Sequence, residues 1–390
     1  MLDEAVRDPL LEEPVEQEQR VTPLELFFDL VFVFALTQVT GFLYRDPTWT
    51  RLIQAFAILM VLWFAWTAYA WLGNTAGSDE GAMRVVLLAA MAPLLVASLA
   101  VPHAFGKDAL VFGIAYFLVR ALHILAYALL ARADPALRAA VFRLARTILP
   151  AAAVLVLAGA LPATGRAVCW GVALAIDYGG LLLSSTEGWR VEPAHFAERH
   201  GLIIIIALGE SIIALGVGAA GLGLGTGMVT GVVLGLAVAA CLWWAYFDVV
   251  AAVAERKLRE AGTVRRARIA RDSYSYLHLP MVGGIVIFAF GVKETLVHAH
   301  AHLESVPAAG LCGGVALYFL ALSAFKRRNV GSFNYPRLVA SATLIALAPV
   351  ATALPALLSL GLVAGIACGL IGYEVLRYAE TRDRIRHGAG

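Results

Sequence analysis

The stretch LELFFDLVFVFALTQVTGFL, residues 24–43, decides the fold class of this chain. It is a long and mostly apolar run, and a bilayer core about 30 Å thick needs roughly 20 apolar residues of helix. Further runs of this kind follow at residues 50–72, 83–102, 109–131, 147–162, 167–184, 200–218, 224–250, 274–292, 308–325, 337–354 and 356–378. The chain is therefore predicted to be an all-α, polytopic membrane protein with about 12 transmembrane helices.

The composition supports this class and excludes a soluble globular domain. Hydrophobic residues make up 61% of the 390 positions, charged residues 15%, and the mean hydropathy is +0.79. Soluble domains are about half apolar and about a quarter charged, so membrane lipids are the expected surroundings and no nucleic-acid partner is expected. The cysteines lie inside apolar runs without CxxC spacing, so neither a disulfide framework nor a metal site is predicted; they are Cys169, Cys241, Cys312 and Cys368.

The loop charges test the number of spans. When loops are assigned alternately to two sides, 24 of the 30 Lys and Arg residues fall on the side of the N-terminal tail. Arg120 lies within a span, and only five residues fall on the opposite side: Arg45, Arg51, Lys107, Arg166 and Lys293. Positive charge concentrates on the cytoplasmic side of membrane proteins. Both termini are therefore predicted to be cytoplasmic.

The chain divides into two predicted halves. Residues 1–20 form an acidic tail, 21–184 a first six-helix half, 185–199 a connecting loop, 200–379 a second six-helix half and 380–390 a basic tail. WFAWTAYAW at 63–71 resembles CLWWAYFDV at 241–249. Two parallel repeats, related by an axis along the membrane normal, are one interpretation. Chance recurrence of aromatic-rich apolar sequence is the other.

Ionisable side chains inside the spans are candidate site residues, because each costs several kcal/mol unless it is paired or solvated. In the first span Glu25 and Asp29 lie one turn apart on the same face. The sequence Thr22-Pro23-Leu24-Glu25 is typical of a helix start with a capping box, which gives Glu25 a structural role. Capping does not explain Asp29, so we interpret Asp29 as a functional carboxylate.

The fourth span carries a polar stripe. Tyr116, Arg120, His123 and Tyr127 share one face at helical periodicity. Arg120 lies near mid-membrane and needs an anionic neighbour. A structural ion pair and a contact with substrate are both open for Arg120; its candidate protein partners are Asp177, Glu210 and Asp29.

The remaining polar residues within spans are Asp177 in the sixth, Glu210 in the seventh, Asp248 in the eighth and His278 in the ninth. By helix rise, most of these groups lie in the cytoplasmic half of the membrane. The sequence therefore predicts a polar site that opens inward. The run HAHAH at 298–302 reads as a solvated loop, and the glycines of Gly221–Gly227 as a tight hairpin.

Two segments resemble a known family. TPLELFFDLVFVFALTQVT at Thr22–Thr40 and ERHGLIIIIALGESIIALG at Glu198–Gly216 are similar to the two signature motifs of the low temperature requirement A (LtrA) family of bacterial membrane proteins. The resemblance covers about residues 20–380 and implies a multi-pass protein of the bacterial inner membrane. By motif position it marks six residues: Glu25, Asp29, Glu198, His200, Glu210 and Ser211.

Two functions are compatible with these patterns. In the first, the protein binds and translocates a small solute or ion, with Asp29, Glu210, Arg120 and His123 holding the solute or a coupling proton. In the second, it is an intramembrane enzyme that acts on an isoprenoid or lipid by acid-initiated cyclisation or by Mg²⁺-dependent diphosphate chemistry. Its chamber would then be lined by aromatic residues: Trp63, Trp66, Tyr69, Trp243, Trp244 and Tyr246. The transport interpretation is favoured; Mg²⁺ belongs to the alternative only, and a homo-oligomer is left open.

Overall fold

The computed structural model describes residues 20–76, 81–219, 223, 225–380 and 382, and these residues are almost entirely helical. The predicted acidic tail, most of the basic tail and most of the Gly221–Gly227 hairpin lie outside the described residues. The helices of the first half are α1 (Pro23–Arg45), α2 (Trp49–Ala76), α3 (Gly81–Ala100), η1 (Val101–His103), α4 (Ala109–Leu130), α5 (Pro135–Ala160) and α6 (Ala163–Leu183). Those of the second are α7 (Pro193–Ala219), α8 (Thr226–Phe247), α9 (Val250–Glu260), α10 (Thr263–Ile269), η2 (Ala270–Tyr276), α11 (His278–Val297), α12 (Ser305–Val330), α13 (Tyr335–Ala351) and α14 (Ala356–Arg377).

The predicted fold class is confirmed. Eleven of the described helices are long and apolar enough to cross a membrane, and α13 is a shorter apolar helix. Together they match the twelve predicted runs in order. Three helices extend well beyond their apolar runs: α5 begins at Pro135 instead of 147, α7 begins at Pro193 instead of 200, and α12 continues to Val330. The extensions of α5 and α12 carry arginines, whose long side chains can reach water from beyond the edge of the hydrocarbon.

The loops form two groups, as the alternation of the spans requires. On the side where α1 begins and α14 ends, which we call the basic side, Arg143 donates to the Glu187 carbonyl and Arg382 pairs with Asp248. On the opposite side, Arg166 donates to the Phe105 carbonyl, and His302 forms an isolated β-bridge with Pro355. Contacts between loops thus join turns of the same side. We predict that the basic side is cytoplasmic.

The order in which neighbouring helices contact one another recurs in the two halves of the chain. In the first half α1 contacts α2 and α3, and then α3 contacts α4, α4 contacts α5 and α5 contacts α6. In the second half α7 contacts α8 and α11, α11 contacts α12, α12 contacts α13 and α13 contacts α14. The contact between α2 and α4 likewise has a counterpart between α8 and α12. These contacts recur in both sets of six membrane helices, whereas α14 also contacts α11 and α12, for which α6 shows no equivalent contact of that size.

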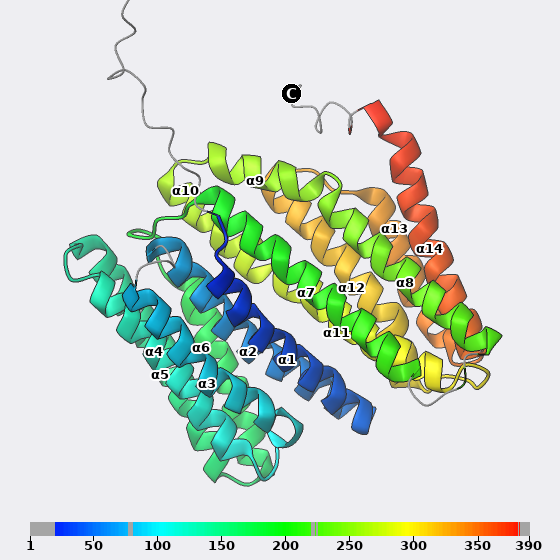
Figure 1. Ribbon diagram of the computed structural model, residues 1–390, viewed down its shortest axis with the longest axis horizontal. Helices are drawn as coiled ribbons and strands as arrows, with labels where there is room; N and C mark the ends of the chain where they lie inside the picture. Colours follow the sequence, from blue (N-terminus) through cyan, green and yellow to red (C-terminus); the bar gives the residue numbers. More distant parts are fainter. Residues whose placement is uncertain (1–19, 77–80, 220–222, 224, 381, 383–390) are drawn as a thin grey trace, which may run out of the picture.

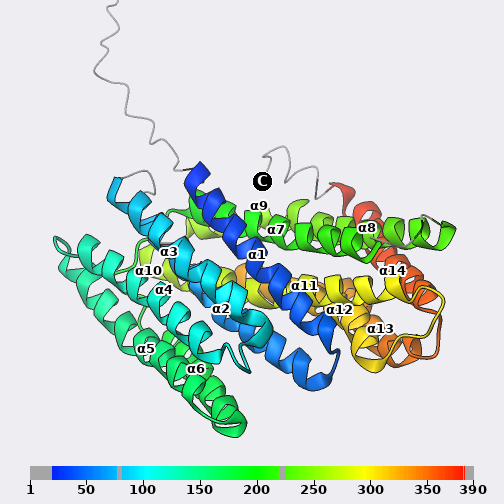
Figure 2. The ribbon, with the colours of Figure 1, turned by 60° about the horizontal axis from the view of Figure 1, so that its bottom comes forward.

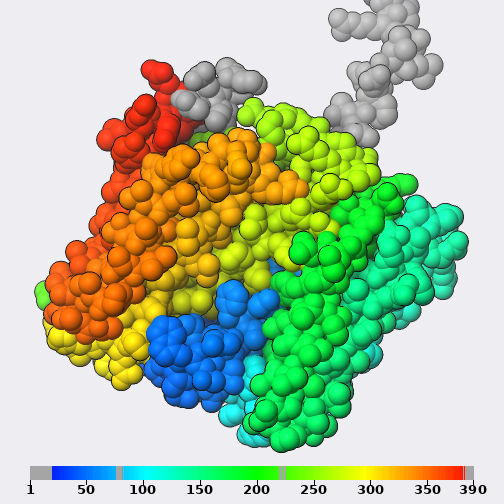
Figure 3. Space-filling model, turned by 180° about the vertical axis from the view of Figure 1, so that it is seen from behind, coloured from blue at the N-terminus to red at the C-terminus, as the bar shows by residue number. Residues whose placement is uncertain are grey.

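The halves meet along α1, α2, α7 and α11. α1 packs against both α7 and α11 and lies between the helices of its own half and those of the second (Figure 1). Turning the molecule keeps α1 at this boundary (Figure 2). From behind, the two halves lie on either side of the early part of α2, which reaches the surface between α6 and the α12–α13 pair (Figure 3). Deeper along α2, Trp63 and Trp66 are fully buried at the boundary.

The basic connection between the eighth and ninth runs is helical. α9 and α10 lie on the basic side and lead into η2, a π-helix over Ala270–Tyr276. π-helical turns are rare and occur frequently at functional sites. Here the π-turn directs Ser275 toward the first half, where its hydroxyl accepts from Trp71 Nε1 at 2.9 Å and its carbonyl from Trp63 Nε1 at 2.6 Å.

Candidate functional site

The polar stripe of α4 points into the first half. Tyr116, Arg120, His123 and Tyr127 are all buried, each with at most 2% of its surface exposed. Helical periodicity places them on one face, and α2, α5 and α6 cover that face. The stripe predicted from sequence is therefore one continuous buried surface.

Arg120 has the anionic neighbour that was predicted. Its Nη2 lies 3.0 Å from Asp177 Oδ1, and Tyr116 donates to the second oxygen of Asp177 at 3.1 Å. Its Nη1 donates to the Phe64 carbonyl at 2.6 Å. These contacts join α4, α6 and α2 at membrane depth. The partner is Asp177, and the other two candidates, Glu210 and Asp29, make their contacts elsewhere.

His123 differs from Arg120 in having no such partners. Its ring contacts Tyr69 and Tyr127 edge-on or tilted, at centroid distances of 5.6 and 5.0 Å. It faces the backbone of Ala68, yet neither ring nitrogen makes a hydrogen bond of acceptable geometry within the described part of the chain. A buried polar group without a partner costs about 1–3 kcal/mol. His123 is therefore available to a bound ligand.

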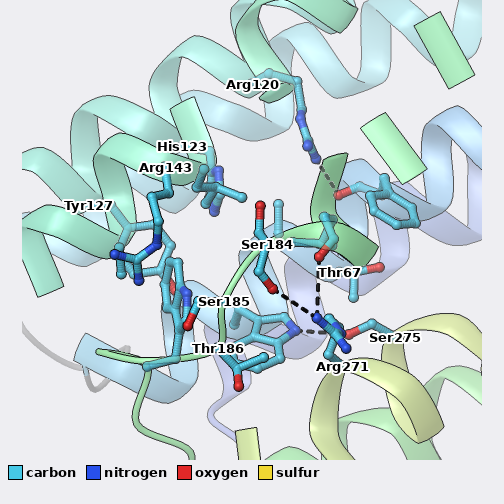
Figure 4. A pocket seen from close by; sticks show the side chains of 17 residues that line it. Thr67, Arg120, His123, Tyr127, Arg143, Ser184, Ser185, Thr186, Arg271 and Ser275 are labelled. Atoms are coloured by element: carbon cyan, nitrogen blue, oxygen red, sulfur yellow. Dashed lines mark hydrogen bonds between the residues drawn. The ribbon is translucent and has the colours of Figure 1, made fainter. Parts of the chain in front are cut away.

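A pocket lies in front of this histidine (Figure 4). It encloses about 700 Å³, part of it open to solvent. Its inner end is formed by Arg120, His123 and Thr67, with Phe64, Trp71, Tyr127 and Trp189 among the walls. Most of the lining surface is apolar, which is typical of pockets that hold a small molecule by a few polar contacts.

The mouth of the pocket is polar and lies on the basic side. Arg143 of α5 donates to the Glu187 carbonyl at 2.6 Å. Arg271, at the start of η2, donates to the carbonyls of Leu181, Leu182 and Ser184 at 3.1–3.4 Å. Basic side chains commonly satisfy the free carbonyls at a helix C-terminus. Arg271 therefore holds the end of α6 and the segment Ser184–Thr186 in place at the rim.

The two carboxylates of α1 lie at the boundary between the halves, not in this pocket. Arg199 of α7 is 3.1 Å from Glu25 Oε1 and 2.8 Å from Asp29 Oδ1. His195 Nε2 lies 3.1 Å from Glu25 Oε2, and Trp66 donates to Asp29 at 2.8 Å. All five side chains are buried. The capping box predicted for Thr22 and Glu25 is present as well, so Glu25 both caps its helix and pairs with α7.

The other residues marked by the family motif contact their surroundings separately. Glu198 accepts from the Val21 backbone at 3.1 Å, and Glu210 accepts from Thr37 at 2.6 Å. Ser211 donates to the Leu208 carbonyl at 2.6 Å. His200 bonds the Phe196 carbonyl through Nδ1 at 2.9 Å and stacks edge-on against Trp66. These residues are spread along α7 and have separate partners, so they do not form one catalytic group.

His278 belongs to a buried aromatic cluster that η2 organises. Its Nε2 lies 2.9 Å from the Tyr246 hydroxyl and its Nδ1 3.2 Å from the Ser273 carbonyl. The Tyr274 ring stacks on it at 5.2 Å, and His200 meets it edge-on at the same distance. His278 therefore has partners for both ring nitrogens, unlike His123.

The structure does not bring the predicted aromatic chamber together. Trp63 and Trp66 are fully buried at the boundary, whereas Trp243 and Trp244 are 43% and 36% exposed on α8. Trp244 instead lies beside Asp248 in a second pocket, where Arg382 pairs with Asp248 at 2.6 Å. Among the described residues, no three His, Cys, Asp or Glu side chains gather as a metal site would need.

Several pocket residues were not singled out from the sequence. Arg143, Arg271 and Ser184–Thr186 lie in segments whose polarity the positive-inside pattern already explains. Trp189 lies in the connecting loop. No sequence signal separates these residues from ordinary loop residues, because the pocket arises only when η2 of the second half packs against α6.

The fold and the polar pocket define a polytopic α-helical membrane protein. A family model for the bacterial low temperature requirement A protein (LtrA) matches residues 20–372, and the chain belongs to this family. It is also similar to an uncharacterized protein, RA0937, of Rhizobium meliloti (strain 1021), with 30% identity over 302 residues that cover 75% of this chain and 73% of the relative. No solved structure matches the chain.

Proposed function

We propose that this protein is a carrier of the bacterial inner membrane. It binds a small solute with an apolar body and a hydrogen-bonding end in the pocket of the first half, and moves that solute across the membrane. The observation that carries the proposal is His123, which is buried at the inner end of a pocket that opens on the basic side and has no well-formed hydrogen bond to any described residue.

The chemistry of the pocket defines the solute class. His123 can donate or accept a hydrogen bond, depending on its tautomer. Thr67 lies beside it, although its hydroxyl already donates to the Trp63 carbonyl at 2.5 Å. The Arg120 guanidinium adds positive charge nearby, partly offset by Asp177. A compact molecule with an acceptor or a partial negative charge at one end, and an apolar or aromatic body, fits this lining.

The repeated packing order supports a carrier. Secondary carriers are often built from two six-helix repeats related by an axis along the membrane normal. The two halves of this chain share most of their helix neighbours, and we propose that residues 21–184 and 193–379 are such repeats. The predicted connecting loop 185–199 is shorter in the structure, because α7 begins at Pro193, and we take α7 as the counterpart of α1.

The contacts between α1 and α7 support the same proposal. Each helix has proline at its first position, Pro23 and Pro193, which lie 170 residues apart. Glu25 and His195, which are in contact, also lie 170 apart, and so do Asp29 and Arg199. In a pair of parallel repeats, residues near the two-fold axis meet their own equivalents. The observed pairs follow this rule and support a proposed axis between α1 and α7.

The enzyme alternative has less support from the same contacts. It needs inner-face carboxylates that can hold Mg²⁺ or protonate a substrate. Glu25 and Asp29 both face the Arg199 guanidinium at the boundary of the halves. This arrangement uses their charge for packing between repeats, and neither carboxylate lines the pocket of His123.

Cysteine labelling of Thr67 tests translocation. Thr67 is 4% exposed and lies deep in the pocket. In a background without the four native cysteines, Thr67→Cys is exposed to a membrane-impermeant maleimide from either side of oriented proteoliposomes. A carrier alternates its access, so we expect fast labelling from the basic side and slower labelling from the opposite side.

The control is Thr186→Cys at the mouth of the pocket, which should be labelled from the basic side alone. Labelling of Thr67→Cys from that side only would contradict translocation and leave a static binding site or an enzyme. Failure of the reagent to reach Thr67→Cys from either side would contradict the pocket itself.

A further inference from the structure

The second half contains a pocket of its own, which the proposed solute site does not use. It encloses about 1170 Å³, part of it open to solvent, on the basic side. α8, α12, α13 and α14 form it, together with the segment after α8. Its polar lining includes Lys326, Arg337 and Arg382, with Asp248 and Glu374.

This pocket occupies the same place in its half as the first pocket does. The first is formed by α2, α4, α5 and α6, and the second by α8, α12, α13 and α14. In the repeated packing order these helices correspond one to one. The recurrence indicates that the second pocket is a built feature of the fold, while its charged lining differs from the mainly apolar first pocket.

The charges of the lining leave positive charge unpaired. Arg337 is 4% exposed, and its Nε and Nη2 each lie 2.8 Å from the carboxylate of Glu374. Arg382 pairs with Asp248. Each carboxylate thus pairs with one guanidinium at contact distance. Lys326 lies near both Glu374 and Arg337 without a hydrogen bond or close ion pair to either, so the described lining carries three cations against two carboxylates.

The pocket also holds an unused hydrogen-bond donor. Arg337 Nη1 is buried and has no hydrogen-bond partner among the described residues. A guanidinium N–H and an ammonium group lining one opening are suited to phosphate oxygens. Leaving such a donor unsatisfied costs free energy unless a ligand or water occupies the space.

We propose that this second pocket binds the phosphate group of an anionic lipid of the adjoining leaflet, through Lys326 and Arg337. The surroundings favour a lipid over free phosphate. Trp244 and Tyr378 line the pocket and are 36% and 42% exposed, as expected for aromatic residues at a membrane interface. Leu376 lies near the end of α14, outside the pocket lining, and is 83% exposed, which gives the outer surface of this helix apolar character for acyl chains. Basic pockets between helices on the cytoplasmic side commonly hold lipid headgroups.

A lipid titration of the purified full-length protein tests the proposal. Phosphatidylglycerol is titrated into the detergent-solubilised protein, and the lipid concentration that gives half of the maximal rise in unfolding temperature is measured. This concentration is called the midpoint. Phosphatidylcholine and inorganic phosphate are titrated in parallel. We expect phosphatidylglycerol to stabilise the wild type and phosphatidylcholine not to. Lys326→Gln should shift the phosphatidylglycerol midpoint about fivefold upward, as expected from loss of one cation near an anionic headgroup.

Lys326→Gln breaks no hydrogen bond or close ion pair among the residues that the structure describes, so we expect the variant to fold. The matched control is Lys257→Gln on α9, which removes the same charge from an exposed ion pair with Glu260 on the same side. An equal midpoint in Lys326→Gln and wild type would overturn the proposal. Stabilisation by inorganic phosphate that Lys326→Gln abolishes, without any by phosphatidylglycerol, would assign the site to a free anion and reject the lipid.

Discussion

At the scale of single residues, Arg120 and His123 show opposite uses of polar groups at membrane depth. They lie one turn apart on α4. Arg120 is held by a carboxylate and a backbone carbonyl, whereas His123 packs against aromatic rings and the Ala68 backbone and makes no well-formed hydrogen bond to a described residue. A satisfied buried group contributes to structure, and an unsatisfied one costs stability. This contrast is why we assign ligand binding to His123 and a positioning role to Arg120.

The substitution His123→Leu should therefore separate stability from function. It removes a buried group that has no hydrogen bond to lose, so we expect an unfolding temperature equal to or above that of the wild type. Binding of any solute that stabilises the wild type in a thermal screen should be lost. Substitutions in binding sites often raise stability while they reduce function, because the site keeps polar groups that only the ligand satisfies.

The matched control is His278→Leu, which removes hydrogen bonds to Tyr246 and the Ser273 carbonyl. That variant should unfold at a lower temperature. If His123→Leu is destabilised as much as His278→Leu, then His123 has a structural partner and the ligand assignment is wrong.

At the scale of helices, the Arg120–Asp177 pair fastens α4 to α6 across the inside of the first half. Removing one member of a buried ion pair leaves the other charge uncompensated, which costs about 3–5 kcal/mol. Asp177→Asn should therefore lower the unfolding temperature of the purified protein strongly. Arg120→Met combined with Asp177→Leu removes both charges and should recover most of the loss, because apolar replacement of a whole buried pair is often neutral.

The measurement is the thermal unfolding midpoint in detergent at one scan rate, since unfolding of such proteins is often irreversible. If the double variant lowers the unfolding midpoint by the sum of the two single-variant losses, the two side chains do not stabilise the protein as a direct pair. Retained solute binding in the double variant would show that Arg120 acts through packing alone.

At the scale of the whole molecule, charged side chains of α1 and α7 pair across the boundary between the halves. In the proposed repeats Asp29 and Arg199 occupy corresponding places, so exchanging them should preserve an ion pair across the proposed axis. We expect Asp29→Arg and Arg199→Asp to aggregate singly, because each places like charges together at a buried boundary. All variants are made in a Glu25→Gln background, because Glu25 also contacts Arg199, and there the double exchange should yield monodisperse protein by size-exclusion chromatography.

If the double variant yields no more monodisperse protein than the worse of the two single variants, the proposed equivalence of the two positions is wrong. The same boundary revises an expectation from sequence, in which Asp29 acts in function more than in folding. Because Asp29 pairs with the buried Arg199 guanidinium, and asparagine can replace only its hydrogen bond with Trp66, we now expect Asp29→Asn to lose stability as well.

Local sequence features were enough for the membrane class, the order of the spans, the division of the loops into two groups and the buried stripe of α4. These follow from local hydropathy, charge and helical periodicity, which each segment carries on its own. The sequence also predicted that Arg120 needs an anionic partner, because an unpaired charge at membrane depth is costly in any fold.

Only the tertiary structure decided which groups meet. It paired Arg120 with Asp177, drew Glu25 and Asp29 to Arg199, and left His123 without a partner. It also formed each pocket from helices far apart in the chain, with Arg271 of the second half closing the first. Hydropathy places a residue at a depth and on a face. The neighbours of that face depend on helix packing, which is set by the fit of whole surfaces and cannot be read from any one segment.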